Sequence, residues 1–196
     1  MKRLTLLMLL FSFSGLTLGE ESGTPQWQPG KNGVAWQAKK RFMLFSDQTP
    51  VGMNQAVTVS LDQVSGGRRI RVVIPIEKFD SGEGIRDENV RELLKIDENK
   101  DLLFLSETLS EDSVTGLTRG TVNRIGGTLR IGRKAWPVAF KIRTVSKGVL
   151  EGEFEGTMSQ LGVEPPSVVG GIVTKVEDYV KLFVRIHLSS LNLKNQ

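Results

Sequence analysis

The sequence predicts an all-β fold, a closed up-and-down barrel of eight antiparallel strands with one short helix between strands. Two observations support this prediction. Apolar and polar residues alternate with period two in several separate segments, as they do in strands with one buried face. Turn-forming residues separate these segments, for example Ser65-Gly66-Gly67 and Gly132-Arg133-Lys134. Closure into a barrel is favoured because it leaves no unpaired strand edge exposed.

The clearest strands lie near the middle and the end of the chain. In the segment 70–77, four β-branched residues at alternate positions share one face, and in the segment 180–188 the same alternation is broken only by Phe183. The predicted strands span residues 34–45, 55–62, 68–78, 102–109, 117–131, 136–145, 149–158 and 179–190.

A short helix is predicted over residues 87–95, between two of these strands. Its apolar stripe at helical spacing consists of Val90, Leu93 and Leu94. Asp87 can cap the first turn. Arg86 can pair with Asp80 or Asp87 and hold the preceding loop against the barrel, and a contact between Arg86 and a ligand head group is the alternative.

The two ends of the chain differ in composition from the strands. Lys2 and Arg3 precede an apolar run that ends near Gly19, a pattern typical of a cleaved secretory signal over residues 1–19. An uncleaved anchor is the alternative. The segment 20–33 is polar and turn-rich, and we expect it to be flexible, with one barrel domain over residues 34–196. We therefore expect the protein to be periplasmic or secreted.

Composition excludes several kinds of chemistry. The chain has no cysteine and one histidine, His187, which we expect to be solvated on a polar strand face, so cysteine–histidine dyads and the usual metal sites are excluded. Removing residues 1–19 lowers the formal net charge from +4 to +2, which argues against nucleic acid as a partner. The acidic clusters near Asp97 and Glu107 resemble solvated faces more than a catalytic site. The prediction is a protein that is not an enzyme and needs no metal or cofactor.

The inward faces of the predicted strands form an apolar interior. An eight-stranded barrel either fills with its own side chains or holds one small ligand. Gly152 and Gly156 fall on an inward face, where we expect them to leave room. The residues predicted to line a ligand are Ile70, Val72, Ile74, Ile76, Leu102, Phe104, Leu129, Ile131, Val138, Phe140, Ile142, Phe154, Met158, Val180, Leu182, Val184 and Ile186. Plain core packing is the alternative for each of them.

Several short motifs occur in the order and spacing of one known family. They are Ser81-Gly82, Arg86-Asp87, Phe104-x-Ser106, Leu129-x-Ile131, Pro137-Val138, Leu161-Gly162-Val163 and the segment 176–182. Together they resemble the YceI family of secreted lipid-binding proteins over residues 34–190. The sequence departs from the family pattern at Asn89-Val90, where the family favours His-Leu. A true lipocalin is a weaker match because Gly33 and Trp36 are one residue too far apart.

The resemblance implies an extended, lipocalin-like barrel that encloses a long isoprenoid chain, such as a polyprenyl or quinone tail. It implies an apolar lipid ligand, a role in lipid transport and transient membrane contact. The oligomeric state stays open, with a homodimer as one option. Two other functions remain: a structural or interaction module whose barrel is filled by side chains, and an enzyme that uses carboxylates such as Asp87 and Glu107.

Overall fold

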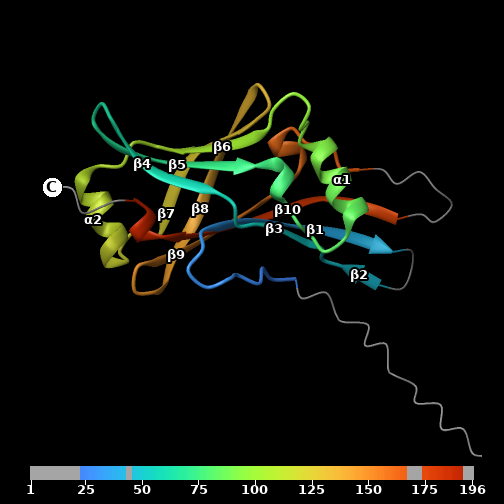
Figure 1. Ribbon diagram of the computed structural model, residues 1–196, viewed down its shortest axis with the longest axis horizontal. Helices are drawn as coiled ribbons and strands as arrows, with labels where there is room; N and C mark the ends of the chain where they lie inside the picture. Colours follow the sequence, from blue (N-terminus) through green and yellow to red (C-terminus); the bar gives the residue numbers. More distant parts are fainter. Residues whose placement is uncertain (1–22, 43–45, 167–173, 192–196) are drawn as a thin grey trace, which may run out of the picture.

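The computed structural model describes residues 23–42, 46–166 and 174–191. Most of these residues belong to one curled antiparallel sheet, with the strand order β2-β1-β10-β9-β8-β7-β6-β5-β4 and with β3 paired to β1 (Figure 1). The strands are β1 Gly33–Phe42, β2 Ser46–Gln48, β3 Val51–Asn54, β4 Thr58–Val64, β5 Gly67–Pro75, β6 Asp101–Ser106, β7 Arg124–Ile131, β8 Lys134–Ser146, β9 Val149–Gly156 and β10 Thr174–His187.

The all-β fold class is confirmed, but the described residues form a sheet of ten strands where eight were expected. The two additional strands, β2 and β3, lie between the first two predicted strands, residues 34–45 and 55–62, which correspond to β1 and β4. The division between β3 and β4 follows from hydrogen bonding, because Asn54 turns the chain away from β3. Its side-chain oxygen accepts from the Ala56 N–H at 2.9 Å, and its amide donates to the Pro75 carbonyl at 2.7 Å.

The sheet curls into a half-barrel, and the described strands form no ladder between β4 and β3 that would close it. Two backbone hydrogen bonds between Met53 and Asp80, at 2.8 and 2.9 Å, tie β3 to the segment after β5. The 3-10 helix η3 (Leu188–Leu191) packs against β4 at the other side of the opening. Local contacts therefore replace the continuous hydrogen-bond closure that the sequence analysis expected.

Two α-helices within the described residues accompany the sheet. α1 spans Gly84–Leu93, a few residues earlier than the predicted helix, and α2 spans Glu111–Arg119. α2 was missed, since residues 117–131 were expected to be a single strand. Its signals are local: the Ser110 hydroxyl accepts from the Ser113 N–H at 3.2 Å, and Gly120 ends the helix with a φ of 71°. Val114 and Leu117 face inward from it and are buried.

Residues 23–32 lie against the outer face of β1 and β3. The Gln37 side chain donates to the Gly23 carbonyl, and the Gln26 N–H contacts the Met53 sulfur at 3.2 Å. Arg185 lies over the Trp27 ring at 5.9 Å. The predicted signal segment, residues 1–19, lies outside the described residues.

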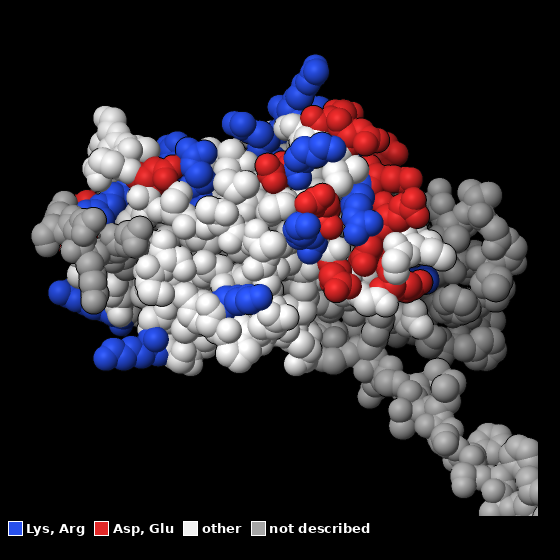
Figure 2. Space-filling model, viewed as in Figure 1, with Lys and Arg blue, Asp and Glu red and all other residues white. Residues whose placement is uncertain are grey.

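Charge is unevenly spread over the surface. Figure 2 shows acidic side chains gathered over α1 and the loop that follows it, while the middle of the same face carries few charges. Asp97, Glu98 and Asp101 are all exposed there, as expected of a solvated face. None of the described helices is long and apolar enough to cross a membrane.

Candidate ligand-binding cavity

An apolar cavity of about 90 Å³ lies inside the curled sheet. Its walls come from β1, β5, β6, β7, β8 and β10, which places strands from both ends of the chain around one space. The lining residues are Val34, Ala35, Trp36, Ile70, Val72, Ile74, Phe79, Leu102, Phe104, Ile125, Leu129, Phe140, Ile142, Leu182, Phe183, Val184 and Ile186. No ionisable side chain lies among them, so the space suits an apolar group.

Most of the residues predicted to line a ligand do line this cavity. The predicted residues on its wall are Ile70, Val72, Ile74, Leu102, Phe104, Leu129, Phe140, Ile142, Leu182, Val184 and Ile186. The other predicted residues, Ile76, Ile131, Val138, Phe154, Met158 and Val180, belong to the surrounding core and do not line it. Ile76 does not line the cavity because residues 76–78 form a 3-10 helix instead of continuing the strand. Met158 does not line it because β9 ends at Gly156.

Several residues that line the cavity were not predicted from the sequence. Ile125 lies four residues before Leu129 in β7, so both side chains point to the same face of the sheet. The alternation predicts this once β7 is recognised as a strand separate from α2. Val34 and Trp36 alternate along β1 in the same way. Phe183 broke the predicted alternation of the last strand, yet it is only 9 % exposed. It lies opposite Ala35 of β1, and the Lys181 ammonium covers its ring at 4.9 Å from the centroid.

Aromatic rings occupy the room that inward glycines were expected to leave. A Cβ on Gly156 would lie 2.8 Å from the Phe154 ring, and one on Gly127 would lie 2.8 Å from the Phe104 ring. A Cβ on Gly152 would lie 2.7 Å from Ile142 and 2.8 Å from Val184. The glycines therefore allow large apolar side chains to fold over the strands, and the free space is smaller than expected.

Two solved structures are similar to this chain in fold. BcnA from Burkholderia cenocepacia has a TM-score of 0.51 and 14% sequence identity, over 79% of this chain and 94% of its own. A polyisoprenoid-binding domain from Saccharophagus degradans, implicated in plant cell wall breakdown, also has a TM-score of 0.51, at 7% identity, over 78% of this chain and 91% of its own. The chain has a YceI-like fold. The resemblance seen in the motifs is thus confirmed at the level of the fold.

The YceI protein of Campylobacter jejuni is also similar, at 16% identity over 83% of this chain and 85% of its own, with a TM-score of 0.38. No protein-family model matches the sequence, and no curated protein does.

In this YceI-like chain, the loop before α1 is held by a buried carboxylate. Asp87 is 7 % exposed and accepts from the Ser81 N–H at 2.9 Å and from the Ser81 hydroxyl at 2.5 Å. The Arg86 guanidinium donates to the Ser81 hydroxyl at 2.9 Å and to the Ser81 carbonyl at 2.8 Å. Asp87 therefore hydrogen-bonds to the preceding loop and does not cap the helix. Together with Arg86 it holds this loop in place, as the sequence predicted.

His187, the one histidine of the chain, is the last residue of β10. Its side chain is half-buried rather than solvated. The Asn32 side-chain oxygen accepts from the His187 backbone N–H at 2.7 Å, and the Asn32 amide donates to the Ser190 hydroxyl at 2.9 Å. The His187 ring Nε2 has no hydrogen-bond partner among the described residues. No group of three or more potential metal ligands occurs in the part of the chain that the structure describes.

Proposed function

We propose that this protein is a secreted or periplasmic binding protein that carries a long apolar lipid, of the polyprenyl or quinone-tail type, inside its barrel. The observation that carries the proposal is the cavity inside the curled sheet, whose lining residues include no ionisable side chain. A neighbour of the same fold is a polyisoprenoid-binding domain, which supports this ligand class. The protein would act without catalysis and without a metal.

The energetics of such binding need no charged anchor. Burying one methylene contributes about 0.8 kcal/mol, so ten carbons would contribute roughly 8 kcal/mol before the cost of association. Selectivity would then depend on the width and length of the cavity. Since branched isoprenoid chains are wider than straight acyl chains, the shape of the wall would distinguish them.

The size of the cavity sets a condition on this function. Its volume of about 90 Å³ is below the range of roughly 300–1,000 Å³ typical of small-molecule pockets. The space accommodates a short stretch of a chain, and a longer ligand requires side chains such as Phe104 and Phe140 to rotate away. This narrow interior also favours the second candidate function, a structural or interaction module with a side-chain-filled barrel.

A cavity-blocking substitution distinguishes the two functions. Val184→Trp places an indole in the cavity, and we expect the affinity for geranylgeraniol, a C20 isoprenoid alcohol, to fall by about tenfold or more. Val145→Trp is the matched control, because Val145 is 37 % exposed on β8 and does not line the cavity. Titration of lipid-free protein measures both affinities. If the unsubstituted protein takes up no isoprenoid, the filled-barrel module is correct.

The proposed location follows from residues 1–19. Their basic start and apolar run match a secretory signal, and signal peptidase would then remove them. We expect the exported protein to begin near Glu20, with a mass lower by the first 19 residues. Intact-mass measurement of the protein from the periplasm or the medium checks this. A full-length chain retained in the membrane would instead support the anchor.

A further inference from the structure

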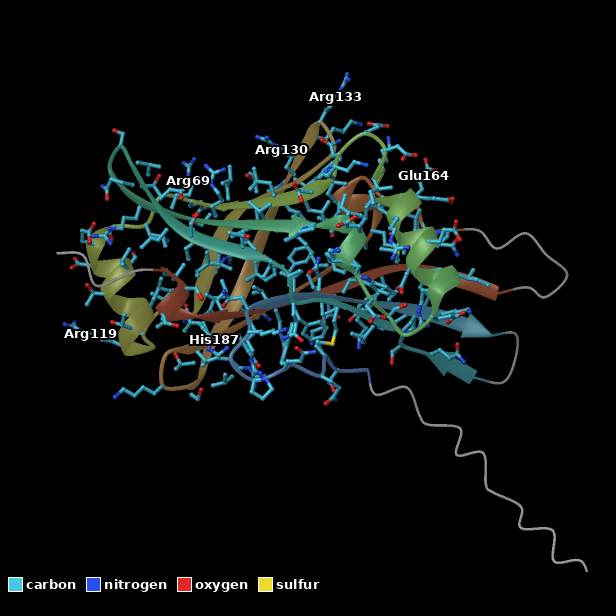
Figure 3. The ribbon with its side chains drawn as sticks, in the orientation of Figure 1. Arg69, Arg119, Arg130, Arg133, Glu164 and His187 are labelled. Atoms are coloured by element: carbon cyan, nitrogen blue, oxygen red, sulfur yellow. The ribbon has the colours of Figure 1, made fainter. Side chains whose placement is uncertain are left out.

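The wall of the half-barrel is interrupted between β8 and β9. Their ladder runs from the Ser146–Val149 pair to the Lys141–Glu153 pair and stops there. Before Lys141, the residues of β8 pair with β7 alone, and after Glu153, the residues of β9 pair with β10 alone. In Figure 3, Arg130 and Arg133 mark the hairpin of β7 and β8, and His187, at the end of β10, lies on the opposite side of the view.

The interruption has defined ends. At one end it begins beyond the Lys141–Glu153 pair, and at the other the Trp136 ring lies directly over Gly162. The segment between them on β8, residues 137–140, has a length of about 13 Å at about 3.3 Å per residue. We call this gap the side opening.

A cleft of about 790 Å³ leads to the side opening from outside. It is lined by Glu107, Arg124, Gly126, Gly127, Pro137, Val138, Ala139, Lys141, Glu153, Phe154, Glu155 and Lys181. Its lining includes charged groups of both signs and the small residues Gly126, Gly127 and Ala139. Its volume is large enough for the polar end of an amphipathic molecule.

Backbone geometry shows that β8 presents an unpaired edge to the side opening. The Ile142 N–H donates toward β7, to the Asn123 carbonyl at 2.8 Å. Backbone groups alternate in direction along a strand, so those of Ala139 point away from β7 and into the opening. The backbone of Pro137, two residues earlier, also faces the opening. Proline has no N–H to donate there, which is typical of a strand edge that stays unpaired.

Three aromatic rings connect the cleft to the cavity. Phe154 lines the cleft, and its ring centroid lies 6.2 Å from that of Phe140. Phe140 lines the cavity and meets Phe104 edge-on, with the centroids 5.6 Å apart. Phe154 thus lies between the outer cleft and the cavity.

The rim carries cations that the fold itself does not neutralise. Arg124 and Lys141 are cross-strand neighbours, both exposed, and neither forms an ion pair within the described residues. Lys181, by contrast, pairs with Glu153 at 2.8 Å. Burial, and then the Glu155 carboxylate, raise the pKa of the nearby Tyr179 hydroxyl, which therefore stays neutral at physiological pH.

We propose that the apolar chain of the ligand passes sideways through the side opening, that Phe154 gates this passage, and that the polar end of the ligand stays in the outer cleft. The inference rests on the proposed carrier function and adds the route of uptake. Passage through the wall would spare the chain from threading lengthwise from one end of the barrel. The ring of Phe154 needs only to rotate, since it is half-buried and lies over Gly156.

Cross-linking the side opening tests the proposal. The chain has no cysteine, so Ala139→Cys with Glu155→Cys introduces two unique thiols, one on each side of the opening. A short bifunctional thiol reagent then joins β8 to β9. We expect the rates of uptake and release of fluorescently labelled geranylgeraniol to fall together, each by about tenfold or more, while the Kd stays within about twofold. Stopped-flow fluorescence measures the rates.

The matched control joins the same two strands where they are already paired. Arg143→Cys with Glu151→Cys occupies an in-register pair of the ladder, and the same reagent should leave both rates unchanged there. Unchanged rates in the cross-linked Ala139/Glu155 variant, with binding intact, would overturn the side route in favour of an end of the barrel. If the unmodified protein does not bind the probe, the carrier function fails, and the side route with it.

Substitution of Phe154 gives a second, independent readout. Phe154→Ala should raise the rate of uptake by about tenfold, whereas a ring with a purely packing role would change stability alone. Phe140→Ala, which truncates a ring on the cavity side, controls for loss of packing. Equal rates for Phe154→Ala and the unsubstituted protein would contradict the gate.

Discussion

Phe104→Ala is expected to lower the free energy of unfolding by about 3–5 kcal/mol. Phe104 is 8 % exposed, meets Phe140 edge-on at 5.6 Å, and covers the strand where Gly127 has no side chain. Removing the ring leaves a cavity that the strands cannot close, because the backbone of β7 is fixed by its ladders on both sides. Denaturant unfolding measures the loss.

The same substitution also enlarges the ligand cavity, so it separates stability from binding. At temperatures where Phe104→Ala remains folded, we expect it to bind geranylgeraniol at least as well as the unsubstituted protein. Ile85→Ala is the control for stability, since Ile85 is 72 % exposed and its truncation should change stability by less than about 0.5 kcal/mol. A loss below about 1 kcal/mol for Phe104→Ala would show that the ring does not support the core.

Gly67→Ala is expected to be similarly severe, at about 2–5 kcal/mol. Gly67 has a φ of 148°, which favours glycine, and a Cβ there would collide with the Leu109 carbonyl oxygen. That carbonyl cannot move freely, because it accepts from the Arg68 N–H at 2.9 Å, and the Leu109 N–H donates back to Arg68 at 2.7 Å. The collision is therefore with fixed backbone.

The neighbouring glycine provides a matched control. Gly66 has a φ of 85°, but a Cβ there meets nothing within 4 Å. Gly66→Ala should cost only the backbone strain, about 1 kcal/mol, so the difference between the two variants isolates the contact with Leu109. Thermal and denaturant unfolding of both measure it. Equal losses would mean that the β4–β5 hairpin moves aside without cost.

The alternation of apolar and polar residues predicted most of the barrel interior, because the face on which a side chain lies is set within each strand. Ile70, Val72 and Ile74 line the cavity as their spacing indicated. Ile76 has the same spacing but leaves the wall, because the chain turns into a 3-10 helix after Pro75. Periodicity shows which residues are apolar on one face, but it does not show where a strand ends.

The helix α2 shows a different reason for error. Its cap residues Ser110 and Gly120 are visible in the sequence, and Val114 and Leu117 have helical spacing, yet residues 117–119 were expected to begin a strand. Packing decided between the two, since Leu117 is 1 % exposed beneath the sheet. The side opening could not be predicted at all, because it depends on where the β8–β9 ladder stops.

The sequence by itself determined the fold class, the absence of thiol chemistry and the identity of most apolar residues that face inward, because these depend on residue type and local spacing. Only the tertiary structure decided how much room those residues leave. Free volume depends on how side chains from distant strands interlock: Phe104, Phe140 and Phe154 come from three strands, and their rings fill the space over the inward glycines. The same packing places Phe154 between the outer cleft and the cavity.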